Sequence, residues 1–219
     1  MSPRNIIYKA KEKGMHIIAV TDHNTTKNVE VCVELGKRHS IYVIPACEVN
    51  TIEEVHCLCY FQNVIVLKEF QTYLDDMLPD IKNDTDKFGF QVAVDKDDII
   101  VYEEERSLFM AINDSIDNLA KYVYELDGIF IPAHVDRPKN SIFSQLGFIP
   151  FDLKYSALEI SKHSSYKEFI KIHPELSDDI IITNSDAHYP EDIATVYNKF
   201  KMGKADWDNF KAYFKETCR

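Results

Sequence analysis

The chain has 219 residues, is 45% hydrophobic and 28% charged, and carries a formal net charge of -11. This acidic balance argues against a broad interface with duplex nucleic acid, and no apolar run approaches the roughly 18 residues of a membrane span. Five cysteines without a regular spacing, and no signal peptide after Met1, predict a reduced, cytoplasmic protein.

The first third of the chain alternates helices with strands. Ser2 followed by Pro3 is a typical helix start, and the apolar face that follows ends at Gly14. The further elements predicted here are a strand at residues 16–21, a helix at 28–39, a second strand at 41–46 and a third strand at 55–61. Helices between strands imply a parallel sheet, so the pattern predicts an α/β fold.

This alternation is interrupted from about residue 62 to residue 116. An acidic, helix-like stretch at residues 70–81 precedes two β-rich runs at 91–94 and 99–102, and polar residues separate the two runs. Such a pair of runs predicts a β-hairpin. We therefore expect a single domain over residues 1–219 with an inserted α+β hairpin segment at about 62–116.

After the insertion the alternation resumes. We expect a helix that is capped by Asp114 or Ser115 and stopped by Gly128. The later elements are strands ending at Ala133 and lying at 157–160, a helix at 166–172, a strand at 180–183 and an amphipathic helix from about Ala205.

Side chains of the metal-ligand type recur where the apolar runs stop. They are Asp22, His23, Glu48, His56, His134, Asp186 and His188. In α/β folds the carboxyl ends of strands meet at one edge, where the chemistry is placed. Imidazole nitrogens and carboxylate oxygens together suit Zn, Mn or Fe, and a carboxylate such as Glu48 can bridge two ions. Six of the seven side chains therefore predict one polynuclear metal site.

Strand geometry narrows the ligand set. Alternation places His56 on one face of its strand and Cys57 and Cys59 on the other, so the two cysteines should pack as small apolar residues. Asp22 and His23 are adjacent and cannot both face one metal without a sharp turn. We expect His23 to be the ligand and Asp22 to be an orienting group behind it.

Two features keep alternative interpretations. A single histidine is more often a hydrogen-bonded surface or core residue than a metal ligand. Four of the eight histidines lie at strand ends, and taken together they make that interpretation weaker. Arg137, three residues after His134, is a candidate clamp for a phosphate group, and its alternative is an exposed loop arginine.

Five segments resemble the PHP (polymerase and histidinol phosphatase) superfamily. They are residues 19–24 (Ala-Val-Thr-Asp-His-Asn), 44–49 (Ile-Pro-Ala-Cys-Glu-Val), 55–56 (Val-His), 132–134 (Pro-Ala-His) and 184–188 (Asn-Ser-Asp-Ala-His). The resemblance covers nearly the whole chain outside the insertion. It implies a distorted (β/α)7 barrel with up to three divalent metal ions, Mn, Zn or Fe, and a metal-bound hydroxide as the nucleophile.

Carried over to this sequence, the resemblance implies a role for each ligand. His23 and His188 would share one ion and Glu48 and Asp186 a second, while Glu48 would bridge to a third ion held by His56 and His134.

The chain departs from the family pattern at its start. Family members normally begin with a strand carrying His-x-His, and this sequence contains none. The resemblance therefore implies a barrel that is incomplete at the N-terminus, from a misplaced translation start, a fragment or a degraded paralogue, with the intact motifs favouring the first two. The chain would hold one ion or none, and its exposed sheet edges would favour self-association.

The function implied is a metal-dependent phosphoesterase, related to nucleoside bisphosphate phosphatases or short-oligonucleotide exonucleases and impaired in this chain. Its partner would be a small phosphorylated substrate or a short oligonucleotide, with no duplex nucleic acid and no membrane. The alternative is a non-catalytic PHP remnant that serves as a binding or structural module. An amidohydrolase is a weaker reading, because no metal-bridging lysine can be placed at a strand end.

Overall fold

The computed structural model describes residues 1–215 of the chain. The strands are β1 (Ile17–Val20), β2 (Tyr42–Asn50), β3 (His56–Tyr60), β4 (Val92–Val94), β5 (Ile100–Glu103), β6 (Ile129–Pro132), β7 (Leu158–Ile160) and β8 (Ile181–Thr183). The α-helices are α1 (Pro3–Glu12), α2 (Val29–Arg38), α3 (Val64–Met77), α4 (Thr85–Phe88), α5 (Ile116–Glu125), α6 (Ile142–Leu146), α7 (Tyr166–Ile172) and α8 (Trp207–Lys215). Within the described residues, no helix is long and apolar enough to cross a bilayer.

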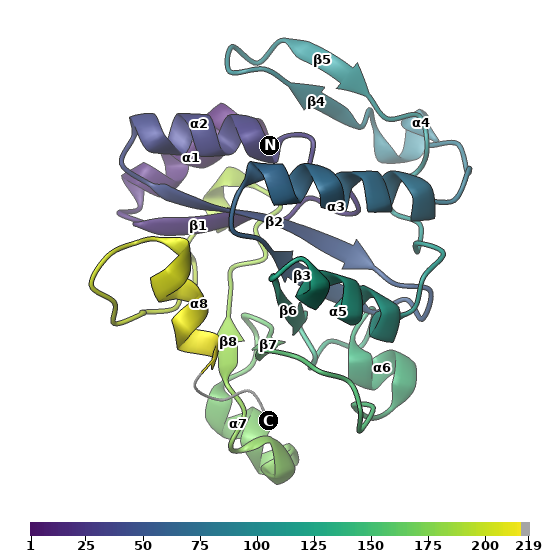
Figure 1. Ribbon diagram of the computed structural model, residues 1–219, viewed down its shortest axis with the longest axis vertical. Coiled ribbons are helices and arrows are strands. Elements are labelled where there is room, and N and C mark those ends of the chain that lie inside the picture. The colour runs from purple at the N-terminus through teal and green to yellow at the C-terminus, as the bar shows by residue number, and fades with distance from the viewer. Residues whose placement is uncertain (216–219) are drawn as a thin grey trace.

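The strands form three separate sheets. One has four strands in the order β1-β2-β3-β6, and the other two are the pairs β4-β5 and β7-β8. The β4-β5 hairpin lies at one end of the molecule and β7-β8 toward the other (Figure 1). The hairpin predicted within the insertion is thus confirmed, whereas residues 1–215 do not close into a barrel.

The expectation of a parallel sheet is wrong for two of the three pairings in the four-stranded sheet. β1 pairs parallel to β2, but β2 with β3 and β3 with β6 are antiparallel. Only residues 51–55 connect β2 to β3, and so short a connection can reverse the chain but cannot cross over. A single reversed strand, β3, therefore accounts for both antiparallel pairings, and β1, β2 and β6 run in the same direction.

Strand β2 is longer than its sequence pattern predicts because it changes partner along its length. Tyr42 to Pro45 pair with β1, and Ala46 to Asn50 pair with β3. An isolated bridge between His23 and Glu48 continues the β1 pairing past the end of β1. This register brings His23 beside Glu48.

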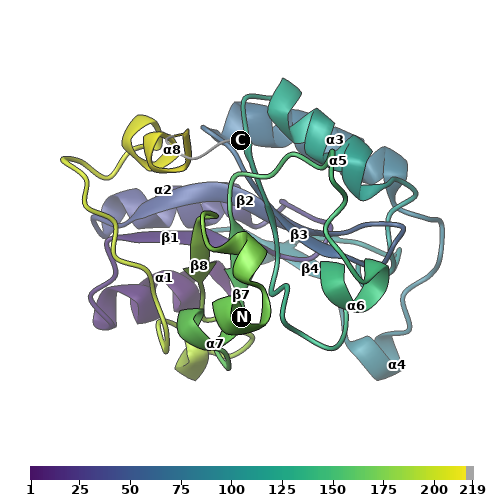
Figure 2. The ribbon, with the colours of Figure 1, turned by 90° about the horizontal axis from the view of Figure 1, so that it is seen from below.

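Helices cover the four-stranded sheet on both of its faces. Figure 2 shows α3 and α5 together above β2 and β3, and α1 below β1. Phe70 of α3 and Leu119 of α5 belong to the same buried cluster as Cys57 and Cys59 of β3. Leu58, the residue between these cysteines, packs in a second cluster with Phe210 of α8. The predicted alternation along β3 is therefore confirmed.

Local signals fix the helix that precedes β6. Ser115 is its N-cap and accepts a hydrogen bond from the backbone N–H of Asn118 at 3.2 Å, which decides between the two predicted caps. The turn after α5 ends at Gly128. A residue with a side chain does not fit there, because its Cβ would lie 2.8 Å from the Val123 carbonyl oxygen and 2.9 Å from that of Tyr60. A larger residue would push α5 away from β3.

Strands β1 and β8 are among the edge strands of the described residues, each paired on one side only. β1 pairs only with β2, and β8 pairs only with β7. Unpaired edges favour pairing between chains, so we predict self-association that increases with protein concentration in sedimentation velocity. Ile17→Lys should weaken it, because a charge on an edge strand opposes pairing. Ile65→Lys, at a side chain 78% exposed on α3, is the control, and a monomer at every concentration would contradict the prediction.

Candidate metal centre

The direction of the strands brings four predicted ligands to one edge of the sheet. Glu48 lies near the carboxyl end of β2, and His134 follows the carboxyl end of β6. His23 follows β1 in the same way. His56 is the first residue of the reversed strand β3, so its amino end meets the carboxyl ends of the neighbours.

The atoms of these side chains lie at contact distance. One oxygen of Glu48, Oε1, is 3.1 Å from His56 Nδ1 and 3.3 Å from His134 Nε2. The two histidine nitrogens are 3.2 Å apart. The second oxygen, Oε2, is 3.9 Å from His23 Nε2. Candidate ligand atoms of His23, Glu48 and His56 all lie within 4.8 Å of one another.

This geometry fits a divalent metal ion. Tetrahedral ligands at about 2.1 Å from one ion lie roughly 3.4 Å apart, close to the separations among Glu48, His56 and His134. The donor set of imidazole nitrogen and carboxylate oxygen is one that Zn, Mn and Fe accept. Glu48 presents one oxygen to His56 and His134 and the other to His23, the arrangement of a carboxylate able to bridge two ions.

The electrostatics of the cluster favour a cation. Burial alone would raise the pKa of Glu48, but hydrogen bonds with His134 and His56 outweigh it and hold that pKa well below its usual range. Burial alone would lower the pKa of His134, yet the hydrogen bond with Glu48 raises it. Burial lowers the pKa of His23, which keeps that ring neutral. An ionised carboxylate and neutral imidazoles are the forms that bind metal, so a metal ion competes with the proton favoured on His134.

A buried carboxylate that the sequence patterns did not single out positions His134. Glu159 of β7 accepts hydrogen bonds from the His134 backbone N–H at 2.9 Å and from Asn184 Nδ2 at 2.6 Å. His134 has a φ of 32°, a conformation that non-glycine residues rarely adopt and that its surroundings must hold. Burial raises the pKa of Glu159 to about 7. The signal that could have found Glu159 is a lone carboxylate within an apolar strand.

The other predicted site residues lie outside this group of four. The Asp22 carboxylate accepts a hydrogen bond from Asn28 Nδ2 at 3.5 Å, so its side-chain hydrogen bond is to an asparagine rather than to His23. Asp186 Oδ2 is 2.8 Å from Arg137, and Asp186 Oδ1 is 3.6 Å from His188 Nδ1. The side chains of Arg137 and His188 are 44% and 62% exposed. The candidate phosphate clamp is thus bound to a candidate ligand at the surface.

The four cysteines of residues 1–215 take no part in the cluster. Cys47, Cys57 and Cys59 are buried thiols in the apolar core, as their position in the strands predicts. Burial raises the pKa of each well above its usual range, which suppresses the thiolate that would bind a metal. Cys218 lies outside the described residues.

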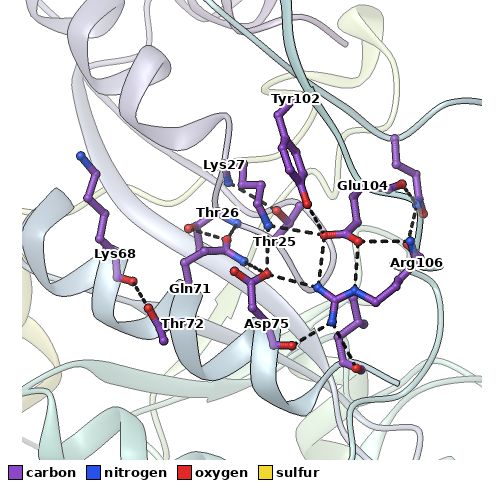
Figure 3. A network of polar contacts seen from close by, with 12 residues as sticks. Thr25, Thr26, Lys27, Lys68, Gln71, Thr72, Asp75, Tyr102, Glu104 and Arg106 are labelled. Carbon is purple, nitrogen blue, oxygen red and sulfur yellow. Dashed lines mark hydrogen bonds and ion pairs between the residues drawn. The ribbon is translucent and has the colours of Figure 1, made fainter. Parts of the chain in front are cut away.

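Within the inserted segment a polar network ties the β4-β5 hairpin and residues 104–106 to α3, and it also reaches the loop after β1 (Figure 3). Arg106 Nε donates to Glu104 Oε1 at 3.0 Å, and its NH1 donates to the Asp75 carbonyl at 2.8 Å. Lys27 Nζ lies 2.9 Å from the Asp75 carboxylate and 3.5 Å from that of Glu104. The Tyr102 hydroxyl donates to Glu104 Oε2 at 3.0 Å. Glu104 is therefore the shared partner of Lys27, Tyr102 and Arg106, and Lys27 and Arg106 extend the network to Asp75 of α3.

Asparagines of the loop after β1 make a second connection to the insertion. Asn24 Nδ2 donates to the carbonyls of Leu108 at 3.0 Å and Met110 at 2.8 Å. Asn28 Nδ2 donates to the carbonyl of Val92 at 3.1 Å. The loop that carries His23 thus also holds residues 108–110 and the hairpin.

The network gives a stability prediction for Glu104→Gln. Burial alone would raise the pKa of Glu104, but hydrogen bonds from Arg106 lower it from 4.5 to about 2. A lowered pKa stabilises the fold above pH 4.5, and this stabilisation is lost as the pH falls toward 2. At pH 7 the variant should lose about 2 kcal/mol in free energy of unfolding, a typical value for hydrogen bonds to a charged group.

Thermal unfolding of both proteins from pH 7 to pH 3 checks this prediction. The difference in stability between the wild type and Glu104→Gln should shrink as the pH falls. Glu105→Gln, at the exposed neighbouring residue, should behave like the wild type. A gap that stays constant with pH would contradict the assignment.

An open cavity of about 1140 Å³ adjoins the cluster. His23, Glu48, His134, Asp186 and His188 all line it. Its walls continue over apolar residues of β1 and β8 and over the inserted segment. A small substrate can therefore reach the cluster from solvent.

Comparisons with known proteins agree with this picture. The PHP domain family model matches residues 1–148. The chain is similar to the lesion-specific endonuclease PfuEndoQ of Pyrococcus furiosus, with a TM-score of 0.71 and 20% identity over 99% of this chain and 51% of that one. It is also similar to a protein assigned as a metal-dependent phosphoesterase from Bifidobacterium adolescentis, with a TM-score of 0.62 and 13% identity over 100% and 92% of the two chains.

Sequence comparison adds a shorter match. Uncharacterized protein MJ1587 of Methanocaldococcus jannaschii is 39% identical over 51 residues, which are 23% of this chain and 30% of that protein. The chain spans about half the length of the Pyrococcus furiosus endonuclease. The likeness to the two solved structures concerns the fold.

Proposed function

This chain belongs to the PHP domain family, and we propose that it is a metal-dependent phosphoesterase acting on phosphate esters of small molecules or short nucleotides. The observation that carries the proposal is the approach of His56 Nδ1 and His134 Nε2 to one oxygen of Glu48 at 3.1 and 3.3 Å. Burying one carboxylate and two imidazoles side by side costs desolvation free energy, and a cation bound among them would offset that cost.

The residues have distinct proposed tasks. Glu48, His56 and His134 would hold one divalent ion, Mn, Zn or Fe, and His23 would lie beside it. Such an ion supplies Lewis acidity, which draws charge from a phosphoester oxygen and makes water a stronger acid. Glu159 fixes the backbone of His134 and so the direction of its ring, as outer groups do in metal sites.

We propose that these 219 residues bind one metal ion and hydrolyse their substrate slowly. The other two ligand pairs implied by the family, His23 with His188 and Glu48 with Asp186, would each give an ion only two protein ligands. Metal content measured by mass spectrometry should approach one ion per chain, and a content of three would contradict this.

The proposed substrates are small or single-stranded. The net charge of -11 weakens attraction to a long polyanion, so we retain the expectation that duplex nucleic acid is not the partner. The similar endonuclease is lesion-specific, which makes a damaged duplex the control substrate to be tested beside small esters. We also propose a cytoplasmic location, because the four cysteines of the described chain are free, buried thiols and form no disulfide.

A non-catalytic binding module is the second candidate function. The observation in its favour is that Asp186 is bound to Arg137 rather than grouped with Glu48. Such a module would bind metal and phosphorylated ligands without converting them.

The two functions separate in one assay. The protein is stripped with a chelator, reloaded with Mn²⁺ or Zn²⁺, and incubated with p-nitrophenyl phosphate, its bis-ester, a short single strand and a damaged duplex. Metal-dependent hydrolysis that His134→Ala abolishes supports the phosphoesterase. Metal binding without turnover of any ester supports the binding module.

Arg137→Ala should act mainly on substrate binding. In the proposed complex the guanidinium leaves Asp186 for the phosphate, a contact that helps ground state and transition state alike. We expect KM to rise roughly tenfold, as for about 1.4 kcal/mol, with a smaller change in kcat. Arg106→Ala is no fair control because it disrupts the hairpin, so Lys139→Ala, in the same loop, serves instead. A fall in kcat alone would refute the clamp.

A further inference from the structure

Three phenylalanines of the inserted segment form an aromatic wall beside the metal cluster. The wall consists of Phe88, Phe90 and Phe109, which are 53%, 70% and 52% exposed. All three line the same open cavity as His23 and Glu48. Large apolar side chains that stay this exposed at the mouth of a site call for a ligand that covers them.

The wall is close to the cluster, and its rings are tilted toward one another. The ring centroid of Phe109 lies 6.4 Å from that of His23, with 44° between the ring planes. Phe88 packs against Phe109 at 5.1 Å with an angle of 35°. A group bound against Phe109 would therefore lie one ring away from a phosphate at Glu48.

The position of Phe109 is fixed by its neighbours in the chain. Asn24 holds the carbonyls of Leu108 and Met110, on either side of Phe109. The Leu108 N–H donates to Gln91 Oε1 at 2.8 Å. The backbone on both sides of Phe109 is therefore anchored by Asn24, a residue of the loop that carries His23. The Phe109 ring is thus part of a preformed site.

We propose that the aromatic wall binds the base of a nucleotide whose phosphoester lies at the Glu48 cluster. The inference rests on the proposed function and adds the substrate class. A nucleobase is flat, stacks on phenylalanine, and is joined to its phosphate through one sugar, so base and ester fit neighbouring places in one cavity. Lys27, which lines the same cavity, is paired with Asp75 and Glu104, so the wall offers stacking rather than a free cation for further phosphates.

Binding measured separately from turnover tests the wall. Calorimetry with the Zn²⁺-loaded protein compares adenosine 5′-phosphorothioate with ribose 5-phosphorothioate, which carry the same anionic ester with and without a base. Phe109→Ala should weaken binding of the nucleotide roughly tenfold, as for about 1.4 kcal/mol of stacking, and leave the sugar ester unchanged. Phe109→Leu should fall between them, and Phe148→Ala, 63% exposed and outside the residues lining the cavity, is the control.

Each outcome has one meaning. Equal affinity of the wild type for the two esters, or equal loss for both in Phe109→Ala, overturns the base site. Selective loss for the nucleotide without hydrolysis of any ester keeps the base site and removes the phosphoesterase. A short single strand added as a third ligand distinguishes free nucleotides from strand ends, since it binds more tightly than the mononucleotide only if further bases find contacts.

Discussion

Glu48→Gln should reduce turnover by about 1,000-fold, the loss expected when several kcal/mol of charge stabilisation in the transition state disappears. The substitution keeps the shape of the side chain and removes its charge. A neutral amide is a poor metal ligand, and two histidines remain where Glu48 had joined them at 3.1 and 3.3 Å. Because even outer groups of a metal site contribute roughly 10–100-fold to affinity, loss of this ligand should weaken metal binding by more.

Steady-state kinetics and metal titration together check the Glu48 prediction. Glu105→Gln makes the same chemical change at an exposed glutamate and should leave both quantities as in the wild type. A Glu48→Gln protein that keeps wild-type metal affinity would show that the ion lies elsewhere.

Removal of metal should lower the melting temperature by about 10 °C. A ligand at 1,000 times its dissociation constant stabilises the folded state by about 4.1 kcal/mol, and each kcal/mol shifts the melting temperature of a chain this size by roughly 2–4 °C. The ion would join loops and strands that are far apart in the sequence, since His56 and His134 are 78 residues apart. Differential scanning calorimetry with Zn²⁺ and with chelator measures the shift.

Two histidine variants make this test specific. His134→Ala removes a buried ligand and should abolish the difference between the metal-loaded and the stripped protein. His163→Ala removes an exposed histidine and should retain the full shift. A shift that survives in His134→Ala would assign the stabilisation to metal bound at another place.

The candidate site was more predictable from the sequence than the fold that carries it. Glu48, His56 and His134 each adjoin a β-rich run, and a period-two alternation sufficed to separate His56 from Cys57. The direction of β3 did not follow from such a pattern, because alternation is the same in parallel and antiparallel strands. The five residues that connect β2 to β3 were the overlooked signal.

Long-range hydrogen bonds explain which partners of the site the sequence patterns did not predict. Glu159 supports His134 from a strand 25 residues away, and Asn24 holds Leu108 across 84 residues. Such contacts depend on how the strands are ordered in space, and the sequence around a single residue does not predict that order. Phe109 belongs to the same class, since an exposed phenylalanine becomes informative only when its neighbour is found to be His23.

The most direct test of the metal centre is an anomalous difference map from crystals grown with Mn²⁺ or Zn²⁺ and measured at the absorption edge of that metal. A metal ion held as proposed should give one strong peak within about 2.1 Å of Glu48 Oε1, His56 Nδ1 and His134 Nε2. A peak bound elsewhere, with these three atoms still joined only to one another, would contradict the proposed metal centre.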